Sequence, residues 1–270
     1  MATLRFTMLG CASSPGVPRL NGDWGKCDPN QPKNRRLRAA ALIQRIADDG
    51  QTTTVVIDTG PDFRQQMIAA GVTELHGVVY THAHADHLHG IDDLRGYWLT
   101  QGALIESYAD NATFARIFDG FQYVYETPPG SAYPPILRRN EIAPGRHFTI
   151  EGDGGPIPFL PLYQEHGSIH SLGFRIGPMA YCTDVSAWPD ESVAQLHGLD
   201  LLVIDALQYR RHPSHFSLEQ AVEWVDRLKP KRAVLTHMHT PLDYDTVMAE
   251  TPDHVEPGYD GLVVELPLTD

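Results

Sequence analysis

The densest group of metal-binding side chains lies at residues 81–87, where three histidines and one aspartate follow a short apolar run. We predict that this run is a buried strand. Alternate residues of an extended segment point the same way, so His82 and His84 should face one metal ion together. Asp86 and His87 are adjacent and can face that ion only if the chain turns, so they are placed to hold a second ion.

Three further candidate ligands each follow an apolar run that we predict to be a strand: His166, Asp184 and His237. The ends of neighbouring strands commonly meet at one rim, where α/β proteins build their sites. Taken singly, these residues could be a loop histidine, a turn former and a core histidine. Taken with the first motif, they predict one seven-residue centre for two ions. Mixed imidazole and carboxylate ligation suits zinc, manganese and iron, and paired ions can convert water to hydroxide near neutral pH.

Asp205 and His215 form a second candidate pair. Asp205 ends another predicted strand. His215 lies ten residues later, just before a predicted amphipathic helix whose start carries the capping-box pattern Ser217 and Gln220. A helix N-terminus carries partial positive charge and free N–H groups, so it suits a phosphate oxygen to which His215 could donate. His212 could take this role instead, and the spacing alone leaves both histidines open.

The pattern His-x-His-x-Asp-His, followed by Gly90, resembles the signature of the metallo-β-lactamase superfamily. The resemblance implies an α/β fold, a four-layer αββα sandwich of two mixed sheets flanked by helices, as a single domain over residues 1–270. It implies two divalent metal ions as cofactors, zinc or manganese, with iron also compatible. It also implies the ligand sets: His82, His84 and His166 for one ion, Asp86, His87 and His237 for the other, and Asp184 as a bridge.

Within the superfamily, the chain resembles the phosphodiesterase branch, most closely the enzymes that open cyclic ribose phosphates in phosphonate breakdown. The opening loop at residues 10–18 and the acid–imidazole pair carry this resemblance. It implies catalytic roles for Asp86, Asp205 and His215: hydroxide between the ions attacks phosphorus, and His215, held by Asp205, protonates the leaving oxygen or stabilises the phosphate. Those enzymes also hold a structural zinc. Here the loop offers only Cys27, and Thr240 stands at the other ligand position, so we expect that zinc to be absent.

Substrate contacts are expected from Ser14, Arg35 and His215. The loop at residues 10–18 is rich in small residues and hydroxyls, and could direct backbone N–H groups at an anion. A plain tight turn explains it equally well. Arg35 and Arg36 could contact phosphate, although a solvated basic turn also fits.

These features predict a dinuclear phosphodiesterase acting on a small cyclic phosphate or a nucleotide-like phosphodiester. A transfer-RNA 3′-processing endonuclease is the first alternative, but no basic, glycine-rich arm is recognisable. An ester or thioester hydrolase of the same fold is the second, and it would not need the His215 pair. A metal-free carrier or a redox di-iron protein would have lost or replaced ligands.

Composition limits the partners. The 270 residues carry a formal net charge of -13, which disfavours a nucleic-acid polymer as partner. Three widely spaced cysteines indicate reduced thiols and a cytoplasmic setting. We expect no signal peptide and no membrane segment, since no apolar run approaches about 18 residues. The expected partner is a small anionic phosphodiester, and a homodimer is an open option.

Several elements should position these groups. We predict strands at residues 40–44 and 54–57, the second leading to Asp58, which should hydrogen-bond the metal loop. Helices are expected at residues 61–70, 88–101 and, more briefly, 111–118. Residues 127–135 contain four prolines, which exclude regular structure, so we predict a loop there, near the active site or at a subunit contact.

Overall fold

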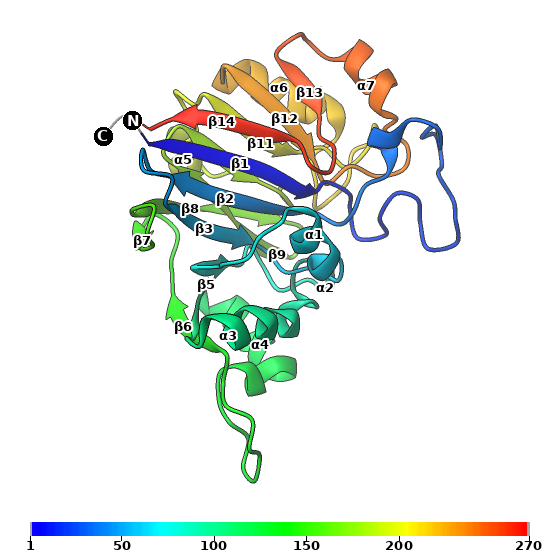
Figure 1. Ribbon diagram of the computed structural model, residues 1–270. Coiled ribbons are helices and arrows are strands. Elements are labelled where there is room, and N and C mark those ends of the chain that lie inside the picture. The colour runs from blue at the N-terminus through cyan, green and yellow to red at the C-terminus, as the bar shows by residue number, and fades with distance from the viewer. Residues whose placement is uncertain (1, 269–270) are drawn as a thin grey trace.

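The computed structural model describes residues 2–268 as two seven-stranded mixed sheets that lie face to face (Figure 1). The first sheet has the order β14 (Val263–Pro267), β1 (Thr3–Gly10), β2 (Ala40–Ile46), β3 (Thr52–Ile57), β4 (Gly77–Val79), β5 (Ile105–Ala109), β6 (Leu137–Glu141). The second has the order β13 (Val255–Pro257), β12 (Arg232–Thr236), β11 (Leu201–Asp205), β10 (Met179–Cys182), β9 (Ile169–Ile176), β8 (Ile157–His166), β7 (Phe148–Ile150).

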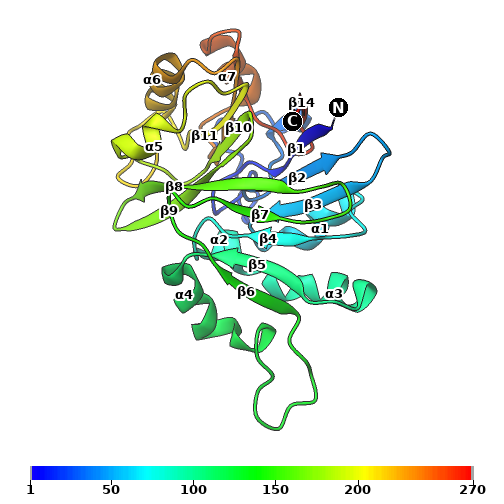
Figure 2. The ribbon, with the colours of Figure 1, turned by 90° about the vertical axis from the view of Figure 1, so that its left-hand side faces the viewer.

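Helices cover the outer faces of both sheets, as Figure 2 shows from the side. The α-helices are α1 (Phe63–Ala69), α2 (Ala85–Leu88), α3 (Arg95–Gln101), α4 (Asn111–Phe121), α5 (Asp190–Ala194), α6 (Leu218–Leu228) and α7 (Tyr244–Glu250). Short 3-10 helices are η1 (Pro32–Asn34), η2 (Ile91–Leu94) and η3 (Gln122–Val124). The predicted sandwich of two sheets flanked by helices is confirmed.

The alternation of side chains along β3 explains how one strand serves two hydrophobic cores. Val55 and Ile57 point into the cluster between the sheets, and Val56 points into the cluster beneath α1, α3 and α4. Both faces of the strand are therefore buried, which is why its sequence is continuously apolar. On the other side, Ala221 and Val225 of α6 pack against the second sheet.

Parallel pairing gathers the strand ends that carry chemistry. Strands β10, β11 and β12 are parallel neighbours, and Asp205 at the end of β11 lies opposite Thr236 at the end of β12. In the first sheet, β3 and β4 are also parallel. The carboxyl ends of these strands therefore lie along one edge, where the site is built.

The helix predicted at residues 88–101 is confirmed only in part: α2 ends at Leu88, the chain turns at Gly90, and residues 91–101 form η2 and α3. A Cβ atom at Gly90 would lie 2.3 Å from the carbonyl oxygen of Gly60 and 2.9 Å from the Cβ of Phe63. The backbone of this turn packs directly against another segment, so the helix cannot continue through it. The helices predicted after Pro61 and at Asn111 are confirmed as α1 and α4.

Residues 127–135 have no helix or strand, as predicted, and project from the body between η3 and β6. The three cysteines are buried and unpaired, which agrees with the predicted free thiols. Between residues 2 and 268 there is no helix with the length and apolar character needed to cross a membrane.

Candidate metal centre and active site

The seven predicted ligands meet in one cluster. His82 and His84 follow β4, Asp86 and His87 belong to α2, and His166 ends β8. The remaining two follow β10 and β12: Asp184 and His237. Their ligand atoms form two adjoining groups that are compact enough to hold a metal ion.

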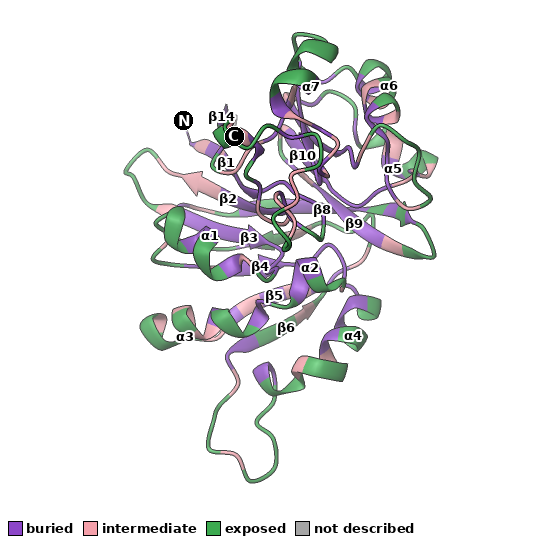
Figure 3. Ribbon diagram, turned by 90° about the vertical axis from the view of Figure 1, so that its right-hand side faces the viewer, coloured by how far each residue is buried: buried purple, intermediate pink, exposed green. Residues whose placement is uncertain are grey.

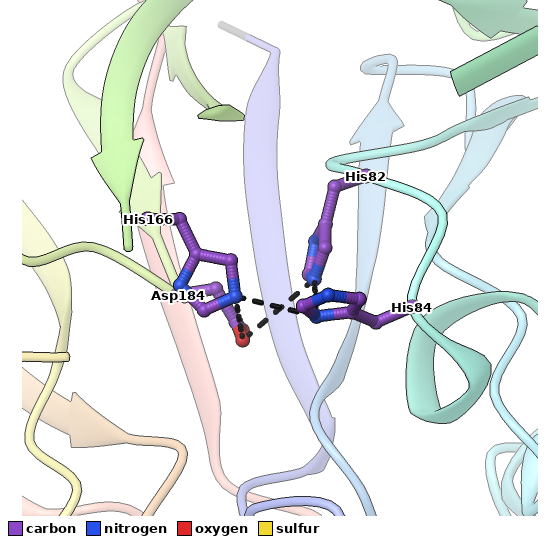
Figure 4. A group of neighbouring side chains, drawn as sticks. All are labelled: His82, His84, His166 and Asp184. Carbon is purple, nitrogen blue, oxygen red and sulfur yellow. Dashed lines mark hydrogen bonds and ion pairs between the residues drawn. The ribbon is translucent and has the colours of Figure 1, made fainter. Parts of the chain in front are cut away.

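The first group contains three imidazoles and Asp184 (Figure 4). Nε2 of His82 lies 2.9 Å from Nδ1 of His84, and Nε2 of His166 lies 3.3 Å from the same atom. One oxygen of Asp184 is 3.8 Å from His82 and 3.7 Å from His166. Nitrogens at about 2.0–2.1 Å from a tetrahedral zinc are about 3.3 Å apart, so this spacing suits a shared ion.

Hydrogen bonds fix which nitrogens face this group. The Thr81 hydroxyl donates to Asp58 at 2.8 Å, so its oxygen accepts from Nδ1 of His82 at 3.0 Å. Nδ1 of His166 donates to the carbonyl of Ser214 at 2.7 Å. Nε2 of both rings therefore carries no proton and faces Nδ1 of His84. Both unprotonated nitrogens are therefore available to a cation at this point.

The second group contains Asp86, His87 and His237. An oxygen of Asp86 lies 3.5 Å from Nε2 of His87 and 3.6 Å from Nε2 of His237. Nδ1 of His87 donates to Asp58 at 2.7 Å, which confirms the predicted contact of Asp58 with the metal loop. Nε2 of His87 and both nitrogens of His237 are buried without a hydrogen-bond partner. Such buried polar atoms are costly unless a ligand satisfies them.

Asp184 lies between the two groups. Its Oδ2 is 3.2 Å from Nε2 of His87, and its Oδ1 is 3.5 Å from Nε2 of His237. Burial opposes ionisation, but His237 and His87 outweigh it and hold the pKa of Asp184 well below its usual range. The carboxylate is therefore ionised and can contact ions on both sides.

The charge states of the imidazoles also suit metal binding. Burial, together with His87, holds the pKa of His82 well below its ordinary value, and burial lowers the pKa of His84 and of His166. These three rings are neutral, the form that binds metals. Burial likewise opposes a proton on His87, but nearby carboxylates, Asp184 first, raise its pKa well above the ordinary value. The second group thus attracts positive charge, which a divalent cation would supply.

The backbone holds three residues of the site in an uncommon conformation. Asp58, Asp184 and His237 have φ of 68°, 55° and 57°, in the left-handed region that disfavours residues with a side chain. Each of them follows closely after a strand of the two sheets. The strain is maintained by the surrounding structure, and it turns these side chains toward one point.

His215 packs against this cluster and pairs with Asp205. Nδ1 of His215 donates to Asp205 at 2.8 Å, and its ring lies 4.7 Å from the rings of both His166 and His237. Burial opposes protonation, but the Asp205 carboxylate overcomes it and raises the pKa of His215 to about 9. His212 is exposed, and its Nδ1 contacts the Ser214 hydroxyl instead. The structure therefore pairs Asp205 with His215, the alternative that spacing had left open.

The predicted substrate contacts lie in different surroundings. Ser14 is exposed, and its carbonyl accepts a hydrogen bond from Arg38 at 3.2 Å. Arg35 is exposed and stacks 5.3 Å from the ring of Trp24. The interpretation of Arg36 as a phosphate contact or a solvated residue is wrong. It is 1% exposed, and its guanidinium donates to the Leu242 carbonyl and to Asn34, so it holds loops together.

One group of polar residues was not predicted from the sequence. Arg19 donates to Nε2 of His239 at 2.6 Å, so Nδ1 of His239 carries the proton and donates to the Ser13 hydroxyl at 2.9 Å. Ser13 in turn bonds through its backbone to Met238, beside the candidate ligand His237. In the sequence, His239 lies two residues after the candidate ligand His237, and this spacing could have indicated that it belongs to the site. Its partners lie over 200 positions away, and no local pattern indicates them.

The central part of the sequence matches a known family. Residues 53–238 match the beta-lactamase superfamily domain, which is more than half of the chain. The chain belongs to the beta-lactamase superfamily. It has the fold of this superfamily and His/Asp clusters that fit divalent metal ions, which are the features of a metal-dependent hydrolase.

Relatives of this superfamily member have several different names. The crystal structure of a new diphosphatase from the PhnP family is 34% identical, the match covers 98% of each chain, and the TM-score is 0.85, so this chain is PhnP-like. An octanoyltransferase from Porphyromonas gingivalis is 35% identical over 96% of the chain, but the chain spans only 51% of that relative. Coenzyme PQQ synthesis protein B from Xanthomonas campestris is 24% identical over 97% of the chain and all of that protein.

Proposed function

We propose that this chain is a metal-dependent phosphodiesterase that hydrolyses a small anionic phosphodiester, either a cyclic phosphate or a nucleotide-like diester. The observation that carries the proposal is the pair of Asp205 and His215, packed 4.7 Å from His166 and His237. A site that only activates water on metal ions has no need of an additional protonated imidazole. Cleavage of a phosphodiester leaves an alkoxide that requires a proton, and His215 is placed to supply one.

Two divalent ions, zinc or manganese, are the proposed cofactors, with iron also compatible. His82, His84 and His166 would hold one ion, Asp86, His87 and His237 the other, and Asp184 both. When bound, such a pair supplies a water of lowered pKa and positive charge beside the phosphoryl oxygens. With two carboxylates and one hydroxide, the formal charge of the centre is about +1, which favours an anionic substrate.

Side chains of the protein perform the remaining steps. Asp205 fixes Nδ1 of His215 as a donor, so Nε2 is the nitrogen that faces the substrate. Because the pKa of His215 is raised to about 9, the ring carries a proton at neutral pH and can give it to the leaving oxygen. The oxygen of Asp86 lies 3.5 Å and 3.6 Å from Nε2 of His87 and His237, so Asp86 would hold its ion, and the water on it, together with these rings. Ser14 and Arg35 are proposed to contact the substrate at the rim.

The alternatives are less well supported. A transfer-RNA processing enzyme needs a basic arm, whereas the projecting loop at residues 127–135 has no charged residue and the chain carries a net charge of -13. Human tRNase Z shares the fold, with a TM-score of 0.62 at 18% identity. The name diphosphatase in the PhnP family favours phosphate chemistry over ester or thioester hydrolysis. A cytoplasmic location, without nucleic-acid or membrane partners, stays part of the proposal.

The test compares substrates on metal-loaded protein. We expect turnover of bis(p-nitrophenyl) phosphate and of cyclic ribose phosphates, with rates on a lactone or thioester lower by about 10²-fold or more. Asp184→Ala should lose metal by elemental analysis and lose turnover, whereas Asp253→Ala, which changes an exposed aspartate, should keep both. Full metal content with preferred hydrolysis of the lactone would refute the proposal.

A further inference from the structure

The loop that joins β1 to β2 lies at the edge of the sheets where the candidate ligands meet. In Figure 1 it projects at the right in blue, and Figure 3 views the molecule from that side. Its first residues run beside the segment that carries His237. Met238 N–H donates to the Cys11 carbonyl at 2.8 Å, and Ser13 N–H donates to the Met238 carbonyl at 3.3 Å. Ser13 is 3% exposed, so a buried hydroxyl lies against the residue that follows a candidate metal ligand.

The hydrogen-bond pattern leaves the hydroxyl hydrogen of Ser13 without an acceptor. An arginine side chain can only donate, so Nε2 of His239 accepts from Arg19 and Nδ1 carries the ring proton. Nδ1 donates that proton to the Ser13 oxygen at 2.9 Å. No carbonyl or side chain between residues 2 and 268 accepts from the hydroxyl hydrogen. Buried polar groups normally have partners, so this donor is available to a ligand.

A positive charge lies at the start of this chain of donors. Nη1 of Arg19 donates to Asp23 at 2.9 Å, which holds the guanidinium in place, and both side chains are 40% exposed. The donors follow one direction, from guanidinium to imidazole to hydroxyl. Hydrogen bonds in such a chain polarise one another, so the last hydroxyl is a stronger donor than that of an isolated serine. A strong donor next to a positive charge favours a negatively charged acceptor.

The segment after β12 also contacts the loop that leads to His215. His239 N–H donates to the carbonyl of Leu207, in that loop, at 2.9 Å. The ring of His215 stacks 4.7 Å from the ring of His237. This segment is therefore held by two loops, one that carries Ser13 and one that carries His215. Both side chains adjoin the same candidate metal group.

The hydroxyl of Ser13, rather than the backbone around it, is the free donor of the loop at residues 10–18. Four backbone N–H groups of the loop already donate within the chain: those of Ala12, Ser13, Gly16 and Val17. These four groups are not available to an anion. A site for an anion in this loop therefore depends on a side chain.

We propose that the Ser13 hydroxyl donates a hydrogen bond to a phosphoryl oxygen of the substrate, and that Arg19 and His239 are positioning residues that act through it. This inference rests on the proposed phosphodiesterase function. Ser13 binds an oxygen that stays on phosphorus, whereas His215 serves the oxygen that leaves, so the two donors have separate tasks. Product phosphate keeps such oxygens, and it should therefore bind to the same donor.

Calorimetric titration of inorganic phosphate into metal-loaded protein tests this donor without turnover. Ser13→Ala should weaken phosphate binding by about tenfold or more, because a hydrogen bond to a charged group is lost. Elemental analysis should find its metal content unchanged. Ser131→Ala removes a hydroxyl of the projecting loop and is the matched control, which should bind phosphate as the unmodified chain does. We expect kcat/KM on bis(p-nitrophenyl) phosphate to fall in the same ratio in Ser13→Ala.

A double-mutant cycle tests whether His239 acts through Ser13. His239→Leu removes the donor to the Ser13 oxygen and should weaken phosphate binding by about threefold or more. Adding His239→Leu to Ser13→Ala should cause no further loss, because the path to the ligand is already broken. Arg19→Met should act as His239→Leu does. Arg116→Met, which changes another arginine paired with an aspartate, should have no effect. Circular dichroism checks that each variant is folded.

The proposal is overturned if Ser13→Ala binds phosphate as tightly as the unmodified chain, or if the metal-loaded unmodified chain does not bind phosphate. Loss of metal in Ser13→Ala also overturns it, because Ser13 would then support His237 instead. Additive losses in the double variant overturn the positioning role of His239. Failure of the proposed function looks different: phosphate affinity still falls in Ser13→Ala, but the unmodified chain does not hydrolyse phosphodiesters.

Discussion

At the residue scale, the site depends on a few side chains that orient others. Asp58 accepts from the backbone and hydroxyl of Thr81 and from Nδ1 of His87. Thr81 in turn fixes the tautomer of His82. One buried carboxylate therefore sets the direction of a candidate ligand in each group. Such outer contacts matter because a ligand that can rotate binds a metal less tightly.

His215 should be separable from the metal ligands. We expect His215→Ala to retain its metal yet lose turnover on bis(p-nitrophenyl) phosphate by about 10²-fold or more, because the proton donor is removed while the two ligand groups stay intact. His212→Ala is the matched control, since this ring is exposed and does not contact Asp205. Rates and elemental analysis are measured on the same preparations. An equal loss in both variants, or loss of metal in His215→Ala, would contradict this role.

At the element scale, the start of α6 places the acid–imidazole pair. The backbone N–H of Phe216 donates to the carbonyl of Val185, which follows Asp184. The Ser217 hydroxyl accepts from Gln220 N–H at 3.3 Å, and Gln220 Oε1 accepts from Ser217 N–H at 3.1 Å. This reciprocal cap fixes where the helix begins. The loop containing His215 is thereby joined to the end of β10.

We expect Ser217→Ala to lower the free energy of unfolding by about 1 kcal/mol, because one N–H group of the first turn loses its acceptor. Turnover should also fall, since the cap lies two residues after His215. Urea denaturation and rates on bis(p-nitrophenyl) phosphate measure both effects. Gln220→Glu keeps an oxygen that can accept from Ser217 N–H and should change neither quantity much. If Ser217→Ala is as stable and active as the unmodified chain, the cap does not position this pair.

At the scale of the whole molecule, Asp260 connects loops from distant parts of the chain. It accepts from the backbone N–H of Leu37 at 2.7 Å and from the thiol of Cys11 at 3.6 Å. Cys11 lies in the loop that bonds to Met238, next to His237. Burial raises the pKa of Asp260 to about 7, mainly because its charged form loses hydration. The carboxyl is therefore protonated in the folded chain at acidic pH.

The contribution of Asp260 to stability should consequently fall as pH rises from 4 to 7. In this range the folded chain keeps the proton on Asp260 and the unfolded chain has already released it, so folding is favoured at the lower pH. The shift corresponds to about 2–4 kcal/mol of stability lost by pH 7. Asp260→Asn does not ionise, so in urea denaturation its stability relative to the unmodified chain should rise by that amount between pH 4 and pH 7. Parallel profiles for the two proteins would show that Asp260 does not contribute.

Local patterns were enough to predict much of this protein. The metal motif, the strands before His166, Asp184 and His237, and the cap of α6 are each encoded within a few residues. Alternation of apolar residues and the chemistry of ligand types act over that same short range. For this reason the seven candidate ligands followed from local patterns, whereas the sandwich was expected from the resemblance of the metal motif to the superfamily signature.

Other features were decided only by contacts between distant segments. The break at Gly90 arises because the backbone of Gly60 packs against it. Arg36 is buried because it binds a carbonyl 206 positions away, and Ser13 meets His239 across 226 positions. Asp205 selects His215 over His212 through the path of a loop. A sequence specifies such pairings only through the packed chain, because their energy depends on which surfaces fold against each other.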